Sequence, residues 1–151
     1  MPFTALKPQI LDSLSQEGLS LEQKLTSVCE ILQSSLPVYN WVGVYFANHE
    51  EKTLHLRAFA GEPTEHTMIP FGKGICGQVA VSNDNFVVPD VKEQDNYLAC
   101  SIYVKSEIVV PLFKDGVNVG QIDVDSHTPN SFSREDEDFL EWVNRQVSVI
   151  L

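Results

Sequence analysis

The spacing of apolar residues is helical in the first part of the chain, becomes strand-like after Pro37 and returns to helical near Arg134. The middle region is rich in β-branched and aromatic residues, and short polar segments divide it into about six runs typical of strands. The runs are YNWVGVYFA, TLHLRAF, EHTMIP, NFVVP, SEIVVPLF and VNVGQIDVD. Helices before and after a block of strands favour an α+β fold, with helices packed on an antiparallel sheet.

Local signals place the helices. Ser20 and Gln23 form a capping box, and the apolar period that follows predicts a helix of about 15 residues. A shorter helix is expected at Pro8–Ser15, and a closing helix is expected from about Arg134. GKGICGQVAVSN is expected to be a glycine loop that enters a short helix between strands. The apolar stripe of the first helix is expected to contain Ile10, Leu11 and Leu14.

Length and charge limit the functional classes. A chain of 151 residues is long enough for one compact domain, which we expect to span residues 1–151. The formal net charge of −11 argues against binding to nucleic acid or to anionic membrane surfaces. The amino terminus has neither a basic segment nor a continuous apolar segment typical of a secretory signal, so a cytoplasmic protein is expected. The cysteines and histidines show no metal-binding spacing, so no metal is expected.

Two strands near the end of the chain carry three carboxylates. Asp123 and Asp125 are two residues apart on an expected strand, so their side chains emerge on the same face. A two-residue Asp-Gly turn would pair Glu107 with Val124 and place the glutamate on the opposite face. A three-residue loop, with Gly116 in the left-handed position, would pair Glu107 with Asp123 and bring all three acids to one face. If the three acids form a functional site, the turn between the two strands is therefore expected to be the three-residue loop.

The three cysteines differ in their surroundings. Cys29 lies beside the apolar stripe of a helix and is expected to be an inert packing residue. Cys76 follows two glycines at the start of an expected helix, where the helix dipole favours a thiolate. Cys100 follows a polar loop, from which its side chain can reach solvent. From the residues alone, Cys76 and Cys100 are either structural thiols or a redox pair.

Thiols and clustered carboxylates together indicate a chemistry. Three partly desolvated carboxylates at Glu107, Asp123 and Asp125 cannot all be ionised at neutral pH, so one is expected to hold a proton. A solvated sheet face is the alternative interpretation of the two aspartates. A thiolate beside a carboxylic acid suits the reduction of a sulfoxide: the thiolate attacks sulfur, the acid protonates the departing oxygen, and a sulfenic acid forms. A second thiol converts that sulfenic acid to a disulfide.

Several separate motifs carry a family resemblance. They are PFGKGICG, the AC before SEIVVP, GQIDVDS, NWVGVYF and SFSREDEDFL. From about Leu21 onward, the chain is similar to free methionine-(R)-sulfoxide reductases, small GAF-fold enzymes that reduce the free amino acid and not the protein-bound form. The resemblance implies a GAF-like α+β domain with oxidoreductase activity.

The resemblance also implies roles for individual residues. Cys100 resembles the catalytic nucleophile, and Cys76 resembles a resolving thiol. Glu107, Asp123 and Asp125 resemble the acids that hold the substrate amine and assist protonation of the sulfoxide oxygen. Glu107 and Asp125 are also expected to be catalytic residues.

Two further features complete the expectations. Trp41 and Tyr45 resemble an aromatic wall against the substrate methyl group, and core packing is their alternative role. His66 stands where family members commonly carry another cysteine.

One hypothesis is a reductase that needs no bound cofactor and is recycled by thioredoxin or another small thiol. The other is a non-catalytic GAF module that binds a small amino compound as a sensor. A homodimer is compatible with either.

Overall fold

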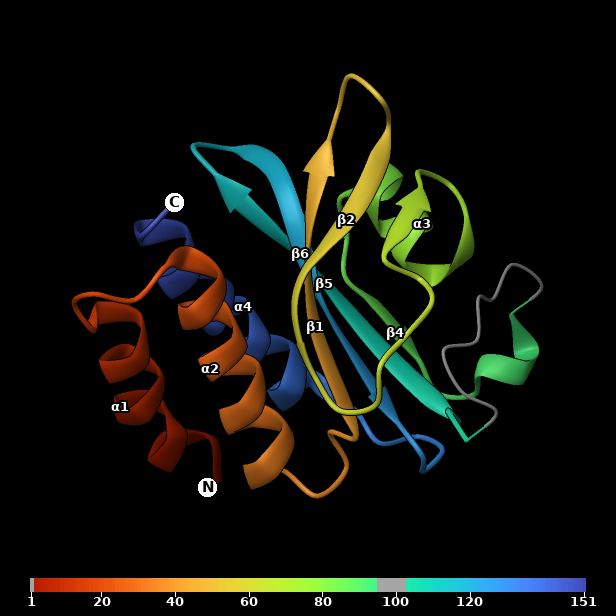
Figure 1. Cartoon of the computed structure of the whole chain (residues 1–151). Helices are drawn as coiled ribbons and strands as arrows, with labels where there is room; N and C mark the ends of the chain where they lie inside the picture. The colour runs from red at the N-terminus through yellow and green to blue at the C-terminus, as the bar shows by residue number, and fades with distance from the viewer. Residues whose placement is uncertain (1, 95–102) are drawn as a thin grey trace.

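The computed structural model describes residues 2–94 and 103–151. Its strands form one sheet in the order β3-β2-β1-β6-β5-β4, and each strand is antiparallel to its neighbours (Figure 1). The strands are β1 (Trp41–Asn48), β2 (Thr53–Ala60), β3 (Met68–Pro70), β4 (Phe86–Val88), β5 (Ser106–Lys114) and β6 (Val117–Ser126). The last strand thus lies at the centre of the sheet, between β1 and β5.

The helices divide between the two faces of the sheet (Figure 1). Three of them, α1 (Pro2–Ser15), α2 (Leu21–Ser35) and α4 (Arg134–Val149), pack on one face. The short helix α3 (Gly74–Ser82) packs on the other, against β5 and β6, and a 3-10 turn, η1 (Val91–Glu93), follows β4. This arrangement confirms the predicted α+β fold.

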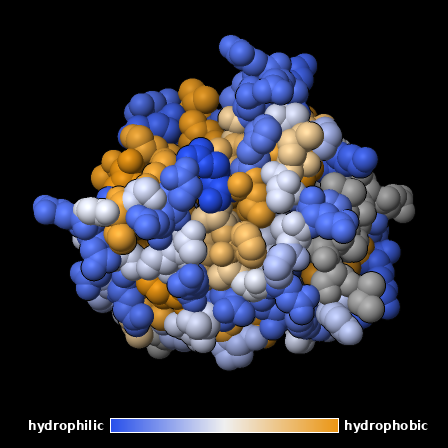
Figure 2. Space-filling view, in the orientation of Figure 1, coloured by the Kyte–Doolittle hydropathy of each residue, from blue (hydrophilic) through white to orange (hydrophobic). Residues whose placement is uncertain are grey.

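The surface mixes hydrophilic and hydrophobic residues in the view of Figure 2. Hydrophilic residues cover the tip of the β1–β2 hairpin, where the polar turn at 49–52 projects from the molecule. Across the two described ranges, no helix combines the length and the apolar character needed to cross a membrane.

Capping explains where two of the helices begin. The Ser20 side chain accepts from the Gln23 N–H while the Gln23 side chain accepts from the Ser20 N–H, which confirms the capping box of α2. Ser133 and Asp136 form the corresponding box of α4. The predicted start of the first helix was wrong, because α1 begins at Pro2 and includes Pro8. Its buried stripe, Leu6, Ile10 and Leu14, continues across the proline, and Leu11 faces solvent.

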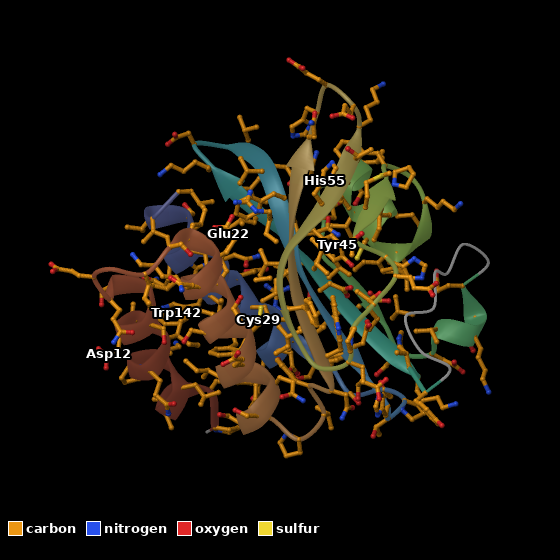
Figure 3. The ribbon with its side chains drawn as sticks, in the orientation of Figure 1. Asp12, Glu22, Cys29, Tyr45, His55 and Trp142 are labelled. Carbon is orange, nitrogen blue, oxygen red and sulfur yellow. The ribbon has the colours of Figure 1, made fainter. Side chains whose placement is uncertain are left out.

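Strand alternation separates two apolar cores. Alternate residues such as Val42, Val124 and Ile108 face α1, α2 and α4, where they form the larger core. The opposite face carries Tyr45 and the residues packed around α3. Figure 3 shows Cys29 on α2 and Tyr45 on the α3 side of the sheet. Cys29 is fully buried in the larger core, which confirms its predicted packing role.

The turn between β5 and β6 corrects one prediction. Lys114 pairs with Val117, so Asp115 and Gly116 form a two-residue turn with φ angles of 52° and 79°. Both positive angles suit the tight hairpin turn that Asp-Gly favours. The predicted three-residue loop is therefore wrong. A bulge then shifts the register between Leu112 and Phe113, so that Val119 of β6 is the extra residue.

Candidate active site

The bulge in β6 brings the three carboxylates to one face of the sheet. Beyond it, Glu107 pairs with Asp125 and Val109 pairs with Asp123. Paired residues on antiparallel strands project to the same side, so all three acids face α3. Glu107, Asp123 and Asp125 are 5%, 2% and 1% exposed. The structure therefore brings the predicted acids together and rejects the solvated-face interpretation.

Interactions with the bulge hold it in place. The Asn118 side-chain oxygen accepts from the Gly120 N–H at 2.9 Å, and its Nδ2 donates to Asn83 Oδ1 at 2.8 Å. Asn83 is the left-handed residue that ends α3. A Cβ at Gly120 would lie 2.1 Å from the Tyr45 carbonyl oxygen of β1, so this part of β6 needs a glycine. The strand register that places the three acids on one face therefore depends on contacts of β6 with β1 and α3.

Asp123 is at the centre of the acidic group. It hydrogen-bonds with Glu107, Cys76 and Asp125. Burial raises the pKa of Asp123, and those three hydrogen bonds oppose the increase. Two carboxyl groups can hydrogen-bond only when one of them carries a proton, so the group holds at least one proton. Within the described ranges, Asp123 Oδ1 is a buried acceptor with no hydrogen-bond partner.

Replacing Asp123 with asparagine is expected to stabilise the folded protein at neutral pH. A carboxyl whose pKa is raised in the folded state contributes its full stability below its unfolded pKa, and this contribution is lost as the pH rises through the folded pKa. The folded pKa of Asp123 lies above its ordinary value of 3.8. Urea unfolding should show a gain for Asp123→Asn of about 0.5–2 kcal/mol near pH 7, larger at about pH 8 than at about pH 5.

An exposed carboxylate provides the control for this stability measurement. Asp138 on α4 is exposed and forms an ion pair with Arg134. Asp138→Asn should change the free energy of unfolding by less than about 0.5 kcal/mol, with little dependence on pH over this range. A stability difference for Asp123→Asn that fails to grow with pH would contradict the raised pKa.

Cys76 lies beneath the acids on the first turn of α3. Its Sγ and one carboxylate oxygen each from Glu107 and Asp123 all lie within 4.8 Å of one another. Groups at this spacing can also approach a cation, whereas the spacing of cysteines and histidines in the sequence predicts no metal site. The Cys76 carbonyl oxygen accepts from Gln121 Nε2 at 3.1 Å, which joins α3 to β6.

The setting of Cys76 corrects a second prediction. Its position near the helix start suggested a thiolate, but the thiol is buried and only 5% exposed. Burial raises the pKa of Cys76 well above its ordinary value, and the charges of Asp123, Glu107 and Asp125 raise it further. These effects outweigh the helix dipole, which contributes about 0.3–1 kcal/mol in exposed settings. Cys76 is therefore a protonated thiol at neutral pH.

Two aromatic residues of β1 lie beside the acids. These residues are Trp41 and Tyr45. Trp41 pairs with Asp125 and Gly43 pairs with Asp123, so Trp41, Gly43 and Tyr45, which alternate along β1, face the same side as the acids. The Trp41 ring lies over Gly43, because a Cβ there would come within 2.2 Å of the ring. Trp41 Nε1 donates to the Glu62 carbonyl oxygen, and Tyr45 Oη donates to that of His66, each at 2.9 Å.

Small pockets flank the acidic group at both ends. One is lined by Cys76, Glu107, Asp123, Tyr45 and His66, among others. The second is lined by a different set that includes Trp41, Val104, Asp125 and His127. The predicted site residues that the structure describes therefore converge on the α3 face.

Cys100 lies outside the described residues, as do the other members of 95–102. The nearest described core residues on either side of this segment, Val91 and Val104, are both buried in the core on the α3 face. The described residues on both sides of the segment therefore pack on the face that carries the acids. The role of Cys100 remains a prediction from the sequence.

Two residues of this face were not identified from the sequence. Gln121 is fully buried and holds the Cys76 backbone, and its Oε1 has no hydrogen-bond partner within the described part of the chain. Its position two residues before Asp123 was the available signal, because alternate strand residues share a face. Gly43 provides the space that the Trp41 ring occupies. No local pattern indicates that role.

The fold and the acidic face together define the class. The sequence profile described as "GAF domain" matches residues 18–151, so the protein contains a GAF domain. A free methionine-R-sulfoxide reductase from Saccharomyces cerevisiae is 38% identical, over 94% of this chain and 86% of the relative. The corresponding Escherichia coli protein is 33% identical, over 84% and 75%. The chain belongs to the free methionine-R-sulfoxide reductase family, whose named members are oxidoreductases.

A solved structure agrees with this assignment. It is the X-ray structure of free methionine-R-sulfoxide reductase from Neisseria meningitidis in complex with its substrate. The two chains are 32% identical and superpose with a TM-score of 0.90, over 98% of this chain and 87% of the other.

Proposed function

We propose that this protein reduces free L-methionine (R)-sulfoxide to methionine, with Cys100 as nucleophile and Cys76 as resolving thiol. The observation that carries the proposal is the buried group of Glu107, Asp123 and Asp125 in contact with a thiol, in a chain of this family. Burial of three carboxyl groups lowers stability, because an ionised carboxylate is poorly accommodated away from water. Their presence in the core therefore indicates a functional site.

The acidic group suits recognition of a free amino acid. The substrate ammonium has three N–H donors and a positive charge, and Asp123 Oδ1 is a buried acceptor with no hydrogen-bond partner in the described part of the chain. Glu107 and Asp125, paired across β5 and β6, flank this position. An amide-bonded methionine residue lacks that charge, so the site favours the free amino acid. Trp41 and Tyr45 provide an aromatic wall for the methyl sulfide end.

The first half of the reaction needs a thiolate and an acid. The Cys100 sulfur attacks the sulfoxide sulfur, while a protonated carboxyl, Glu107 or Asp125, transfers its proton to the oxygen. The sulfoxide S–O bond and the transient bond between the two sulfurs then break, and the protonated oxygen passes to the Cys100 sulfur. Methionine is released, and Cys100 is a sulfenic acid.

The second half returns the enzyme to its starting state. Cys76 attacks the sulfenic sulfur, and a disulfide and water are formed. A small external dithiol such as a thioredoxin then reduces the disulfide, so no bound cofactor takes part. His66 stands where relatives commonly carry the other resolving cysteine, which leaves this task to Cys76. A reducing, cytoplasmic setting fits this cycle.

Stereospecific turnover is the direct test of the proposal. Fully reduced protein is supplied with dithiothreitol and with the free (R)- or (S)-sulfoxide, and the methionine formed is measured. We expect the (R) form to be reduced at least about 100-fold faster, since only one arrangement of oxygen and methyl group places the oxygen on the acids. Binding of the sulfoxide to well-folded protein without turnover of either form would favour the non-catalytic sensor and reject the reductase.

A further inference from the structure

A very small cavity lies between α3 and the acidic strands. It has a volume of about 10 Å³ and is lined by Cys76, Glu107 and Asp123. This is about the room that one water molecule or one small ion occupies. Tyr45 and His66 also line the cavity, and the Tyr45 hydroxyl donates to the His66 carbonyl oxygen at 2.9 Å. The cavity therefore suits a single ion or the ammonium group of a larger ligand.

Three potential metal ligands converge on this cavity from separate elements. Cys76 Sγ on α3 and one carboxylate oxygen each from Glu107 on β5 and Asp123 on β6 all lie within 4.8 Å of one another. A tetrahedral zinc ion with bonds of about 2.0–2.3 Å holds its ligand atoms roughly 3.5 Å apart, a spacing that small side-chain rotations can provide. In residues 2–94 and 103–151, this is the one group of three such ligands.

An unsatisfied oxygen points to an occupant of the cavity. Asp123 lines the cavity and is 2% exposed, and its Oδ1 accepts no hydrogen bond from the described residues. A buried acceptor without a donor destabilises a protein unless a ligand, a water or an ion satisfies it. A cation beside this carboxylate satisfies the oxygen directly.

The charge and the chemistry of the three groups favour one class of cation. Two carboxylates and a thiolate are all anionic when they bind a metal, so a divalent ion offsets their mutual repulsion. Lys73 also lines the cavity, but it is exposed, and solvent screens its opposing charge. Mg²⁺ and Ca²⁺ prefer oxygen ligands throughout, whereas Zn²⁺ binds sulfur and carboxylate oxygen together. The ligand set therefore favours Zn²⁺.

We propose that this cavity binds one Zn²⁺ ion through Cys76 Sγ and a carboxylate oxygen each of Glu107 and Asp123. A zinc–sulfur bond replaces the S–H bond of the thiol, and the displaced protons pass to solvent. No oxidation or reduction takes place.

The bound ion is an inhibitor and not a cofactor, a consequence that rests on the proposed function. It occupies the acids that hold the substrate ammonium and the thiol that resolves the sulfenic acid. A thiolate bonded to zinc and carboxylates neutralised by it are withdrawn from both tasks. Zinc and the free amino acid therefore compete for the same carboxylates.

Zinc binding is measured on fully reduced, metal-free protein without substrate. We expect the protein to take up one equivalent of Zn²⁺ from a chromophoric chelator and to leave Mg²⁺ unbound. Cys76→Ser, Glu107→Gln and Asp123→Asn should each weaken zinc binding by more than about 10-fold, a loss that even residues supporting a metal ligand can cause. Cys100→Ser and Cys29→Ala should bind zinc as the wild type does. Loss of binding in Cys100→Ser would assign the ion to another set of ligands and overturn the proposal.

Cobalt reports the sulfur bond without any measurement of activity. When Co²⁺ replaces zinc, a bond to a thiolate gives a charge-transfer absorption band in the near ultraviolet. The wild type should show this band, and Cys76→Ser should not. The spectrum of the wild type is informative by itself, so a variant that fails to fold leaves the test intact. A wild type without the band, or a band that persists in Cys76→Ser, would overturn the proposal.

Methionine formation separates the metal site from the proposed function. Reduced protein without external reductant is mixed with excess free (R)-sulfoxide, with one equivalent of zinc or with EDTA. Zinc should abolish methionine release, and EDTA should restore it. Zinc binding by a protein that forms no methionine even with EDTA would reject the proposed function and keep the site. Methionine formation by a protein that binds no zinc would reject the site alone, and formation undiminished by bound zinc would reject the inhibition.

Discussion

Replacing Cys100 with serine is expected to lower the rate of methionine formation at least about 10⁴-fold, the scale of loss when a covalent nucleophile is removed. A serine hydroxyl is a poor nucleophile at neutral pH and has no accessible oxidation state that carries the oxygen. Without external reductant, wild-type protein should release one methionine per chain in a burst. Cys100→Ser should release none, as measured by rapid-quench chromatography of the free amino acid.

The other two cysteines provide matched comparisons. Cys76→Ser should retain the burst, because the first half of the reaction needs only Cys100 and the acids, and the sulfenic acid should then accumulate. Cys29→Ala should retain both the burst and steady turnover, because Cys29 is buried in the core on the opposite face, where burial raises its pKa to about 12. A full burst from Cys100→Ser would transfer the nucleophile role to another thiol.

The helices and strands could be predicted because their signals are local. The box of Ser20 with Gln23 lies within four consecutive residues and is present. The start of α1 was wrong for a related reason. A proline was treated as a boundary, whereas the stripe of Leu6, Ile10 and Leu14 continues past it and is buried against other helices. Tertiary packing outweighed the local signal.

The shared face of the acids was predicted, but the way they reach it was not. The Asp115–Gly116 turn alone gives the register that separates Glu107 from the aspartates, and the bulge at Val119 reverses that result. The bulge is held by the contacts of Asn118 with Asn83 and Gly120, so its cause includes a residue of a distant helix end. Such a shift has no short-range sequence signal.

The chemistry of Cys76 shows the same limit. A helix start is visible in the sequence, but the burial of the thiol and its approach to acids from β5 and β6 depend on the whole sheet. The sequence therefore identified the participants and assigned Cys76 the wrong charge state.

Glu107→Gln and Asp125→Asn are each expected to lower kcat/KM for free methionine (R)-sulfoxide by about 10²–10³-fold. Both side chains are buried, and each substitution keeps the shape while it removes the charge and the acidic proton. Loss of ammonium binding raises KM, whereas loss of the proton donor lowers kcat, so steady-state kinetics separate the two roles. The residue that mainly lowers kcat is the acid that protonates the sulfoxide oxygen.

A substrate without the amino group isolates the binding role of the same carboxylates. The sulfoxide of 4-(methylthio)butanoate has the same methyl sulfoxide and carboxylate but no ammonium. Wild-type protein should prefer the amino acid over this analogue by at least about 100-fold, since a missing ammonium leaves buried charge without its partner. The preference should shrink in the variant that lost ammonium binding and should persist in the variant that lost only the proton donor. An unchanged preference in both variants would show that neither Glu107 nor Asp125 binds the substrate ammonium. Asp123 would then be the carboxylate that recognises the free amino acid.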